Sequence, residues 1–388
     1  MADVAKPAKT HGVGVFLELR KRLETGLLIV GKDVASSPAD VVVSAGESSL
    51  HVKTPRGELV LTLPAGVNYE QGSCVPTPAG EFSDEELHFR LRIGVSRHPD
   101  EEAPAVETLR AKETYCFHCQ GCMTRLLEDR EFKRVLPLPN GNWNAIVDDW
   151  CCHPDPFVKK LLPGAEDCLV GDTFLLLARD ASCAETLTQE ESPDESEESP
   201  DSKKTCRRLT LISCKSCSLV LGEAVAPETL KLYITQVVVE PAVGDRELEA
   251  SLNRSLFVEQ TVAARLLGLS SSLSTFHFSV QTPDGKAFLL VWLLNSDSVM
   301  ASVPESCVGD EEPLRAARAL KVLYASSSDT GPQQTDIVAS WEANAVGHPL
   351  VLPLNVCEEL LQVIDDSHAT LPASMRCMRS YEVAYLRL

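Results

Sequence analysis

Two C-x-x-C pairs, Cys119 with Cys122 and Cys214 with Cys217, limit the possible folds of this chain more than any other feature. At this spacing a tight turn directs both sulfur atoms at one point, and two such pairs supply the four thiolates of a tetrahedral Zn²⁺ site. The alternatives are two unrelated reduced pairs or a redox dithiol, although neither pair opens a helix after a strand in a βαβ unit. We therefore expect a structural zinc ion that joins strand pairs from distant parts of the sequence.

The first pair has competing ligands. Cys116 precedes Cys119 at the same spacing, and His118 adds a possible imidazole, so the residues alone leave the ligand set ambiguous. Gly121 permits a turn in which backbone amides point at the sulfur atoms, which favours Cys119 and Cys122. Cys116 is then expected to be a strand residue.

The composition indicates a multi-domain soluble protein: 388 residues, 44% of them hydrophobic, can form two or three cores. A formal charge of −20 argues against direct contact with nucleic acid or an acidic membrane, since both attract concentrated Lys and Arg. Fourteen cysteines are few for a secreted disulfide scaffold of this length, and residues 1–11 are polar. We expect a reducing compartment, with cytoplasmic and nuclear localisation, and no membrane contact.

We predict a β-rich α+β fold in three parts. Residues 12–97 contain short apolar runs separated by turn residues, several of which alternate with polar residues as in a sheet with one solvated face. They predict an N-terminal β-sandwich, and the spacing of the runs resembles that of the small-heat-shock/CS-domain sandwich. Residues 113–224 form the zinc-clipped β domain. Within it, residues 185–204 are acidic and poor in apolar side chains, which predicts a disordered insert.

The third part, residues 228–388, is predicted to be an α+β unit. The run 231–239 indicates a strand, and 256–267 fits an amphipathic helix. Two apolar runs flank the turn sequence at 282–285, which is typical of a β-hairpin. The run 316–324 fits a strand or a short helix.

Between the cysteine pairs, Cys151, Cys152 and His153 precede Pro154 and Pro156. The prolines exclude a helix, so we expect a rigid irregular loop. Consecutive side chains of an extended chain point to opposite sides, so at most one of the two thiols is expected to face solvent. Three interpretations stay open: a packed cluster that caps the zinc domain, a nucleophilic cysteine beside the histidine, or a ligand for the metal of another protein.

Near the C-terminus, Leu352-Pro353 precedes Cys357, which we expect at the start of a helix, where the helix dipole favours a thiolate. The pattern resembles the signature around the catalytic cysteine of HECT ubiquitin ligases, with Val356 in place of the threonine of that signature. We therefore describe residues 348–388 as a HECT-like tail. The alternative is a partly buried cysteine in the first helical turn.

Five further segments can be compared with known families: 135–139, 142–143, 150–156, 291–298 and 357–360. Together they are similar to the HECT-like ubiquitin-protein ligase family that binds a cell-cycle ubiquitin-conjugating enzyme, and the resemblance covers residues 13–388. It implies ubiquitin transfer from that enzyme to substrates such as cyclin B, with Cys357 as thioester acceptor, leading to proteasomal degradation. It places the contact with the conjugating enzyme at Leu256, Phe257, Val262 and Leu266.

The same family is associated with the endonuclease of pre-mRNA cleavage and polyadenylation, whose two-metal site is blocked by a loop that matches Trp150 to His153. The resemblance therefore implies a second possibility, a non-catalytic inhibitor or chaperone of that endonuclease. In it, Cys151, Cys152 or His153 would bind the metal of the partner.

Overall fold

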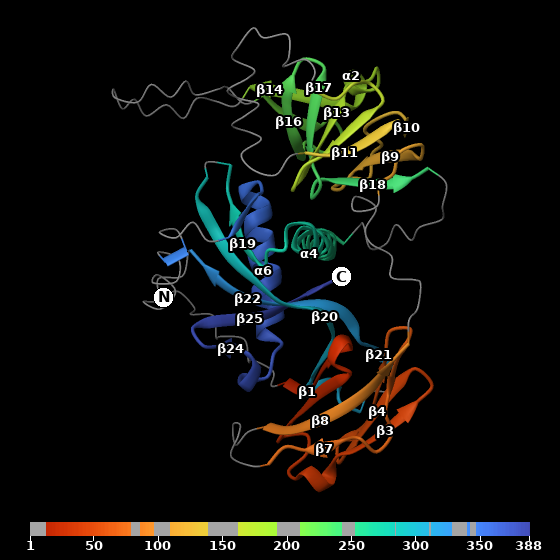
Figure 1. The fold of residues 1–388 in the computed structure, drawn as a ribbon, viewed down its shortest axis with the longest axis vertical. Coiled ribbons are helices and arrows are strands. Elements are labelled where there is room, and N and C mark those ends of the chain that lie inside the picture. The colour runs from red at the N-terminus through yellow and green to blue at the C-terminus, as the bar shows by residue number, and fades with distance from the viewer. Residues whose placement is uncertain are drawn as a thin grey trace, which may run out of the picture. The chain divides into compact units, whose positions relative to one another are not determined.

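The computed structural model describes residues 13–78, 86–96, 109–138, 162–191, 210–242, 253–283, 285–309, 312–327, 340–341 and 347–388. The chain forms two compact units (Figure 1). Unit 1 comprises residues 1–102, 270–349 and 357–388, and unit 2 comprises residues 103–269 and 350–356.

Most strands of unit 1 belong to an 11-stranded sheet, which contains both the first and the last described strand, β1 and β25. Its central part has the order β25-β22-β20-β1-β2-β8, and a four-stranded sheet has the order β21-β5-β4-β3. The strands are β1 (Val13–Arg20), β2 (Thr25–Gly31), β3 (Val42–Gly46), β4 (Ser49–Thr54), β5 (Gly57–Thr62), β6 (Val67–Tyr69), β7 (Val75–Pro76), β8 (Glu86–Val95), β19 (His277–Gln281), β20 (Ala287–Pro304), β21 (Leu314–Arg315), β22 (Ala317–Ser326), β23 (His348–Val351), β24 (Cys377–Met378) and β25 (Tyr381–Arg387).

Strand β1 joins the N-terminal and C-terminal segments, because it pairs with β2 on one side and with β20 on the other. Val15 and Leu17 are buried in one core and Phe16 in another, so β1 is apolar on both faces, as a central strand requires. This arrangement differs from the expected separation of residues 12–97 from residues 228–388.

The β-sandwich itself is confirmed. Leu28 and Phe89 of the large sheet share a buried core with Val52 and Leu61 of the four-stranded sheet. The alternation of apolar and polar residues in these strands therefore does mark one buried face.

Helix α6 (Leu354–Ala369) contacts β22 and β25 (Figure 1). The Tyr324 hydroxyl donates to Asp365 at 3.1 Å, and the Ser367 hydroxyl donates to the carbonyl of Tyr385 at 2.7 Å. The run 316–324, for which the sequence allows a strand or a short helix, lies almost entirely in strand β22. The predicted hairpin is also confirmed: it joins β19 to β20, and Gly285 has φ +83°.

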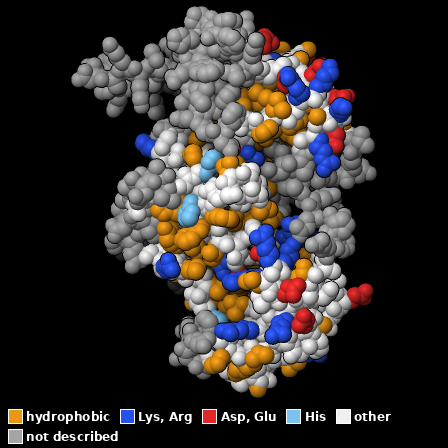
Figure 2. Space-filling view, in the orientation of Figure 1, with side chains coloured by type: hydrophobic (Ala, Val, Ile, Leu, Met, Phe, Trp, Pro, Cys, Tyr) orange, Lys and Arg blue, Asp and Glu red, His pale blue; other side chains and the backbone are white. Residues whose placement is uncertain are grey.

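On the face shown in Figure 2, apolar side chains gather over β19, β22 and β25 of unit 1. On these strands and on β20, His277 stacks on Trp292 with ring centroids 4.8 Å apart, and Trp292 meets Tyr381 edge to face at 6.0 Å. Burial lowers the pKa of His277, so this aromatic cluster is uncharged at neutral pH.

Unit 2 is built from a three-stranded sheet, β10-β9-β18, and a seven-stranded sheet, β11-β12-β13-β17-β16-β15-β14. Phe117 of the first and Leu175 and Ile212 of the second lie in one buried core. The elements are β9 (Thr114–Cys119), β10 (Arg130–Glu131), β11 (Arg134–Pro137), β12 (Asp167–Val170), β13 (Phe174–Ala178), α2 (Cys183–Thr186), β14 (Leu187–Glu191), β15 (Thr210–Cys214), β16 (Val220–Ala226), β17 (Thr229–Tyr233), β18 (Val237–Pro241) and α4 (Arg254–Leu273).

The first part of the predicted disordered insert is ordered. Residues 185 and 186 belong to α2, and residues 187–191 form β14, which pairs antiparallel with β15. Leu187 is buried in the core of unit 2, and the strand pairing satisfies the backbone hydrogen-bonding groups of this polar segment. The amino-acid composition, on which the prediction of disorder was based, reveals neither the burial nor the pairing. Residues 192–204 lie outside the described residues. Among the described helices, none has the length and hydropathy to cross a membrane.

Candidate functional site

The two C-x-x-C pairs occupy equivalent turns at the ends of two strands. Cys119 ends β9 and Cys214 ends β15. The amide of Met123 donates to the carbonyl of Cys119, and the amide of Ser218 donates to the carbonyl of Cys214, both at 2.8 Å. Met123 and Ser218 have positive φ, +56° and +61°. The same turn therefore recurs in two different sheets.

These turns bring the four predicted sulfur atoms together, all within 4.8 Å of one another. The Sγ atoms of Cys119 and Cys217 are 3.5 Å apart, and those of Cys122 and Cys214 are 3.7 Å apart. Zinc–sulfur bonds of about 2.3 Å in a tetrahedron separate neighbouring sulfur atoms by about 3.8 Å, whereas a disulfide needs about 2.0 Å. The geometry therefore fits a metal ion, and the prediction that these four cysteines converge is confirmed.

The competing ligands lie elsewhere. Cys116 donates to Asp129 at 2.9 Å, and neither it nor His118 belongs to the group of converging sulfur atoms. Cys116 is a residue of β9, as expected.

The thiols of Cys119, Cys122 and Cys217 differ in acidity. Burial raises the pKa of Cys119 and of Cys217. Burial also acts to raise the pKa of Cys122, but its hydrogen bonds with Thr124 outweigh burial and lower the pKa to about 7. Of Cys119, Cys122 and Cys217, Cys122 therefore ionises most readily at neutral pH, and a thiolate is the form that binds a metal.

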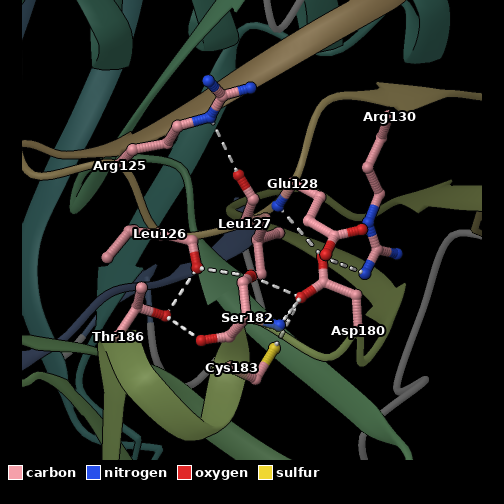
Figure 3. Close-up of polar contacts among 9 residues, drawn as sticks. All are labelled: Arg125, Leu126, Leu127, Glu128, Arg130, Asp180, Ser182, Cys183 and Thr186. Atoms are coloured by element: carbon pink, nitrogen blue, oxygen red, sulfur yellow. Dashed lines mark hydrogen bonds and ion pairs between the residues drawn. The ribbon is translucent and has the colours of Figure 1, made fainter.

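A polar network joins the chain after the first turn to the loop before α2 (Figure 3). Asp180 accepts from Arg130 at 2.9 Å, from the Glu128 amide at 3.2 Å and from the Ser182 amide at 3.0 Å. Burial by itself raises the pKa of Asp180, but the hydrogen bonds of Ser182 and the charge of Arg130 outweigh it and hold the pKa below its usual range. Sequence reasoning missed this network, because its members are far apart in the chain.

Helix α4 is attached to the first cysteine turn. Arg254 donates to the Gln120 side chain at 2.9 Å and also to the carbonyl of Thr235. Farther along, Arg265 donates to the carbonyl of Asp172 at 2.6 Å. Gln120 lies between the two cysteines of the first pair, so the start of α4 is bonded to the candidate metal centre.

The predicted contact with a conjugating enzyme lies on this helix, in two environments. Val262 and Leu266 are 5% and 1% exposed, so they are core residues. Leu256 and Phe257 are half-buried. Only the latter two present surface to a partner in this conformation.

Cys357 lies in the first turn of α6, as the sequence predicts, but its side chain is fully buried. Burial, with a smaller contribution from the nearby charge of Glu358, raises the pKa of Cys357 to about 12. The helix dipole does not offset this desolvation, so Cys357 is a protonated thiol at neutral pH.

The predicted loop of Cys151, Cys152 and His153 lies outside the described residues. The three interpretations of that loop stay predictions.

Comparison with known proteins gives one family. The family model described as HECT-like ubiquitin-conjugating enzyme (E2)-binding matches residues 18–383. Similar proteins include the "E3 ubiquitin-protein ligase E3D" of Mus musculus, 36% identical over 96% of this chain and 98% of its own length. The Rattus norvegicus and Homo sapiens proteins of the same name are 37% and 35% identical and cover 95% and 96% of this chain, and 96% and 98% of their own lengths. No solved structure matches.

Proposed function

Because this chain belongs to the family of HECT-like proteins that bind ubiquitin-conjugating enzymes, we propose that it is a ubiquitin ligase. It binds a conjugating enzyme loaded with ubiquitin and promotes transfer of the ubiquitin to a lysine. The observation that supports this function is the family match over residues 18–383, together with relatives of nearly equal length that are named ubiquitin ligases.

The burial of Cys357 favours direct transfer from the conjugating enzyme over a ligase-bound thioester. A fully buried thiol with a pKa near 12 is neither accessible nor ionised at neutral pH. In direct transfer, the lysine amine attacks the thioester carbonyl on the conjugating enzyme, a C–N bond forms and the C–S bond breaks. The cysteine of the conjugating enzyme leaves as a thiolate and the proton of the amine passes to solvent.

The metal in the proposal is Zn²⁺, held by Cys119, Cys122, Cys214 and Cys217. Four converging thiols suit zinc by ligand softness and by tetrahedral geometry. When bound, the ion is a structural cross-link between the turns that follow β9 and β15.

The conjugating enzyme is proposed to contact the half-buried residues Leu256 and Phe257 at the start of α4. The hydrogen bond between Arg254 and Gln120 holds this turn of the helix in place. The other two predicted contact residues, Val262 and Leu266, support the helix from within.

Two finer assignments come from the family resemblance alone. Cyclin B-type proteins are the proposed substrates. The second function, capping of the metal site of the pre-mRNA 3′-end cleavage endonuclease by Cys151, Cys152 and His153, is tested by replacing each cysteine singly with serine. Undiminished inhibition of the nuclease by both variants would exclude it.

The ligase function is tested by reconstitution with activating enzyme, ATP, ubiquitin and a panel of conjugating enzymes. The full chain is expected to accelerate loss of ubiquitin from the thioester of at least one conjugating enzyme when free lysine is the acceptor. The matched control is a double Leu256→Asp, Phe257→Asp variant, which should bind that enzyme more weakly. A chain that accelerates discharge from no member of the panel is not a ligase of this kind.

A further inference from the structure

The junction of α2 and β14 links the two cysteine turns without a metal. The hydroxyl group of Thr186 donates to the carbonyl of Leu126 at 2.6 Å, and the carbonyl of Thr186 accepts from the amide of Lys215 at 2.9 Å. Leu126 lies shortly after Cys122 in the chain, and Lys215 directly follows Cys214. One residue is thus bonded to the segments that contain both halves of the candidate metal centre.

We propose that Thr186 is a positioning residue of this centre, which holds the two turns at the separation where the four sulfur atoms converge. The inference rests on the zinc site proposed above. Its basis is the pair of hydrogen bonds at Thr186, one made by the side chain and one by the backbone.

The hydroxyl has a second possible acceptor, the carbonyl of Ser182 at 3.0 Å, but it carries one proton and the contact with Leu126 is shorter. The hydroxyl of Ser182 is 3.4 Å from the same Leu126 carbonyl, a weaker contact (Figure 3). Of these two hydroxyl groups, Thr186 therefore makes the stronger bond to the Leu126 carbonyl.

Such a bond changes the free energy of metal binding. Bringing two distant turns together costs chain entropy, and a metal that must order them binds more weakly than one that enters a formed site. If the hydrogen bond already exists in the metal-free protein, the entropy cost of ordering the turns is part of the free energy of folding. It is then no longer part of the free energy of metal binding, so the metal binds more tightly.

The test is the dissociation constant for Zn²⁺ of the full chain, measured by competition with a chromophoric chelator at fixed pH. Thr186→Val keeps the side-chain shape and removes the hydroxyl, and is expected to weaken zinc binding about 3- to 10-fold, the usual worth of one such bond. Thr186→Ser restores the hydroxyl and should bind within about twofold of the wild type, by the same reasoning. Thr188→Val is the matched control, because the Thr188 hydroxyl makes only a 3.4 Å contact, with the carbonyl of Ser213.

A purely structural role gives a different result: Thr186→Val would lower the thermal midpoints of the metal-free and metal-bound proteins equally and leave the dissociation constant unchanged. That result overturns the inference.

A second measurement needs no variant, since the Lys215 amide should be protected from hydrogen exchange in metal-free wild-type protein. Exchange at the rate of an unstructured amide also overturns it. If the wild type binds no zinc, the proposed zinc site itself fails; if it binds zinc and Thr186→Val binds equally well, only the positioning role fails.

Discussion

The Nη1 atom of Arg254 lies 2.9 Å from the Oε1 atom of Gln120, so the first residue of α4 donates to a side chain inside the first C-x-x-C turn. The geometry of that turn and the start of the helix are therefore physically connected. Both belong to unit 2.

Removal of the proposed zinc ion is expected to loosen the start of α4. Without the ion, the turn of Cys119 and Cys122 loses its cross-link to β15, and the acceptor of Arg254 becomes less fixed. Hydrogen exchange measured before and after chelation should show faster exchange around residues 254–259. Residues 360–367 of α6, in unit 1, serve as the internal control. Equal exchange of the α4 segment in both states contradicts the connection.

Cys357 should resist alkylation at neutral pH. Its thiol is fully buried and has a pKa of about 12, so the thiolate is scarce and shielded. Peptide mass spectrometry after brief iodoacetamide treatment of the native protein should find Cys377, which is exposed, modified and Cys357 unmodified. Equal modification of both would mean that α6 opens readily.

The Asp180 carboxylate should stabilise unit 2 in a pH-dependent way. Its pKa is lower in the folded protein, so its stabilisation is complete above the unfolded value of about 3.9 and is lost as the pH falls through the folded value. Asp180→Asn should lower the free energy of unfolding by about 1 to 2 kcal/mol at pH 7, and the difference should shrink below about pH 4. The measurement is urea unfolding at several pH values, with exposed Asp33→Asn as control. A difference that persists unchanged at pH 3 is incompatible with this origin.

A buried ion pair in unit 1 joins β1 to β22. Lys321 of β22 lies 3.2 Å from Glu18 of β1, and the two side chains are 7% and 1% exposed. Lys321→Met should destabilise the fold by about 3 kcal/mol, because it leaves a buried carboxylate with Arg20 at 3.5 Å as its remaining charged neighbour. The double variant Glu18→Leu, Lys321→Leu should recover most of the loss in thermal unfolding. If the double variant is less stable than the single one, the cost does not come from the unpaired charge.

The sequence predicts local features of this fold well. The C-x-x-C spacing identifies all four converging cysteines, because each turn is made by neighbouring residues. The hairpin at 282–285 and the helix around 256–267 also follow from local patterns. Burial is harder to predict. An apolar helix face can pack on the core of the same chain or on a partner protein, so the pattern of α4 does not show that Val262 and Leu266 are core residues.

Long-range pairing could not be predicted from one sequence. Nothing in the pattern of β1 specifies β20 as its second neighbour, although its two apolar faces do indicate a central strand. The sequence predicts a helix that starts near Cys357, because a helix start is a local feature. It does not predict that the Cys357 side chain is fully buried, because burial depends on which distant residues pack against the helix. The bonds of Thr186 to the segments of both turns cannot be predicted from the sequence either, because they depend on the pairing of β14 with a distant strand.

The most direct test of the proposed mechanism is single-turnover discharge of ubiquitin from a conjugating enzyme to lysine, with wild-type chain and with Cys357→Ala. Direct transfer predicts equal rates and no reducible ubiquitin adduct on either chain. A wild-type adduct that disappears in Cys357→Ala, together with loss of discharge, would contradict direct transfer and make the buried cysteine a thioester acceptor.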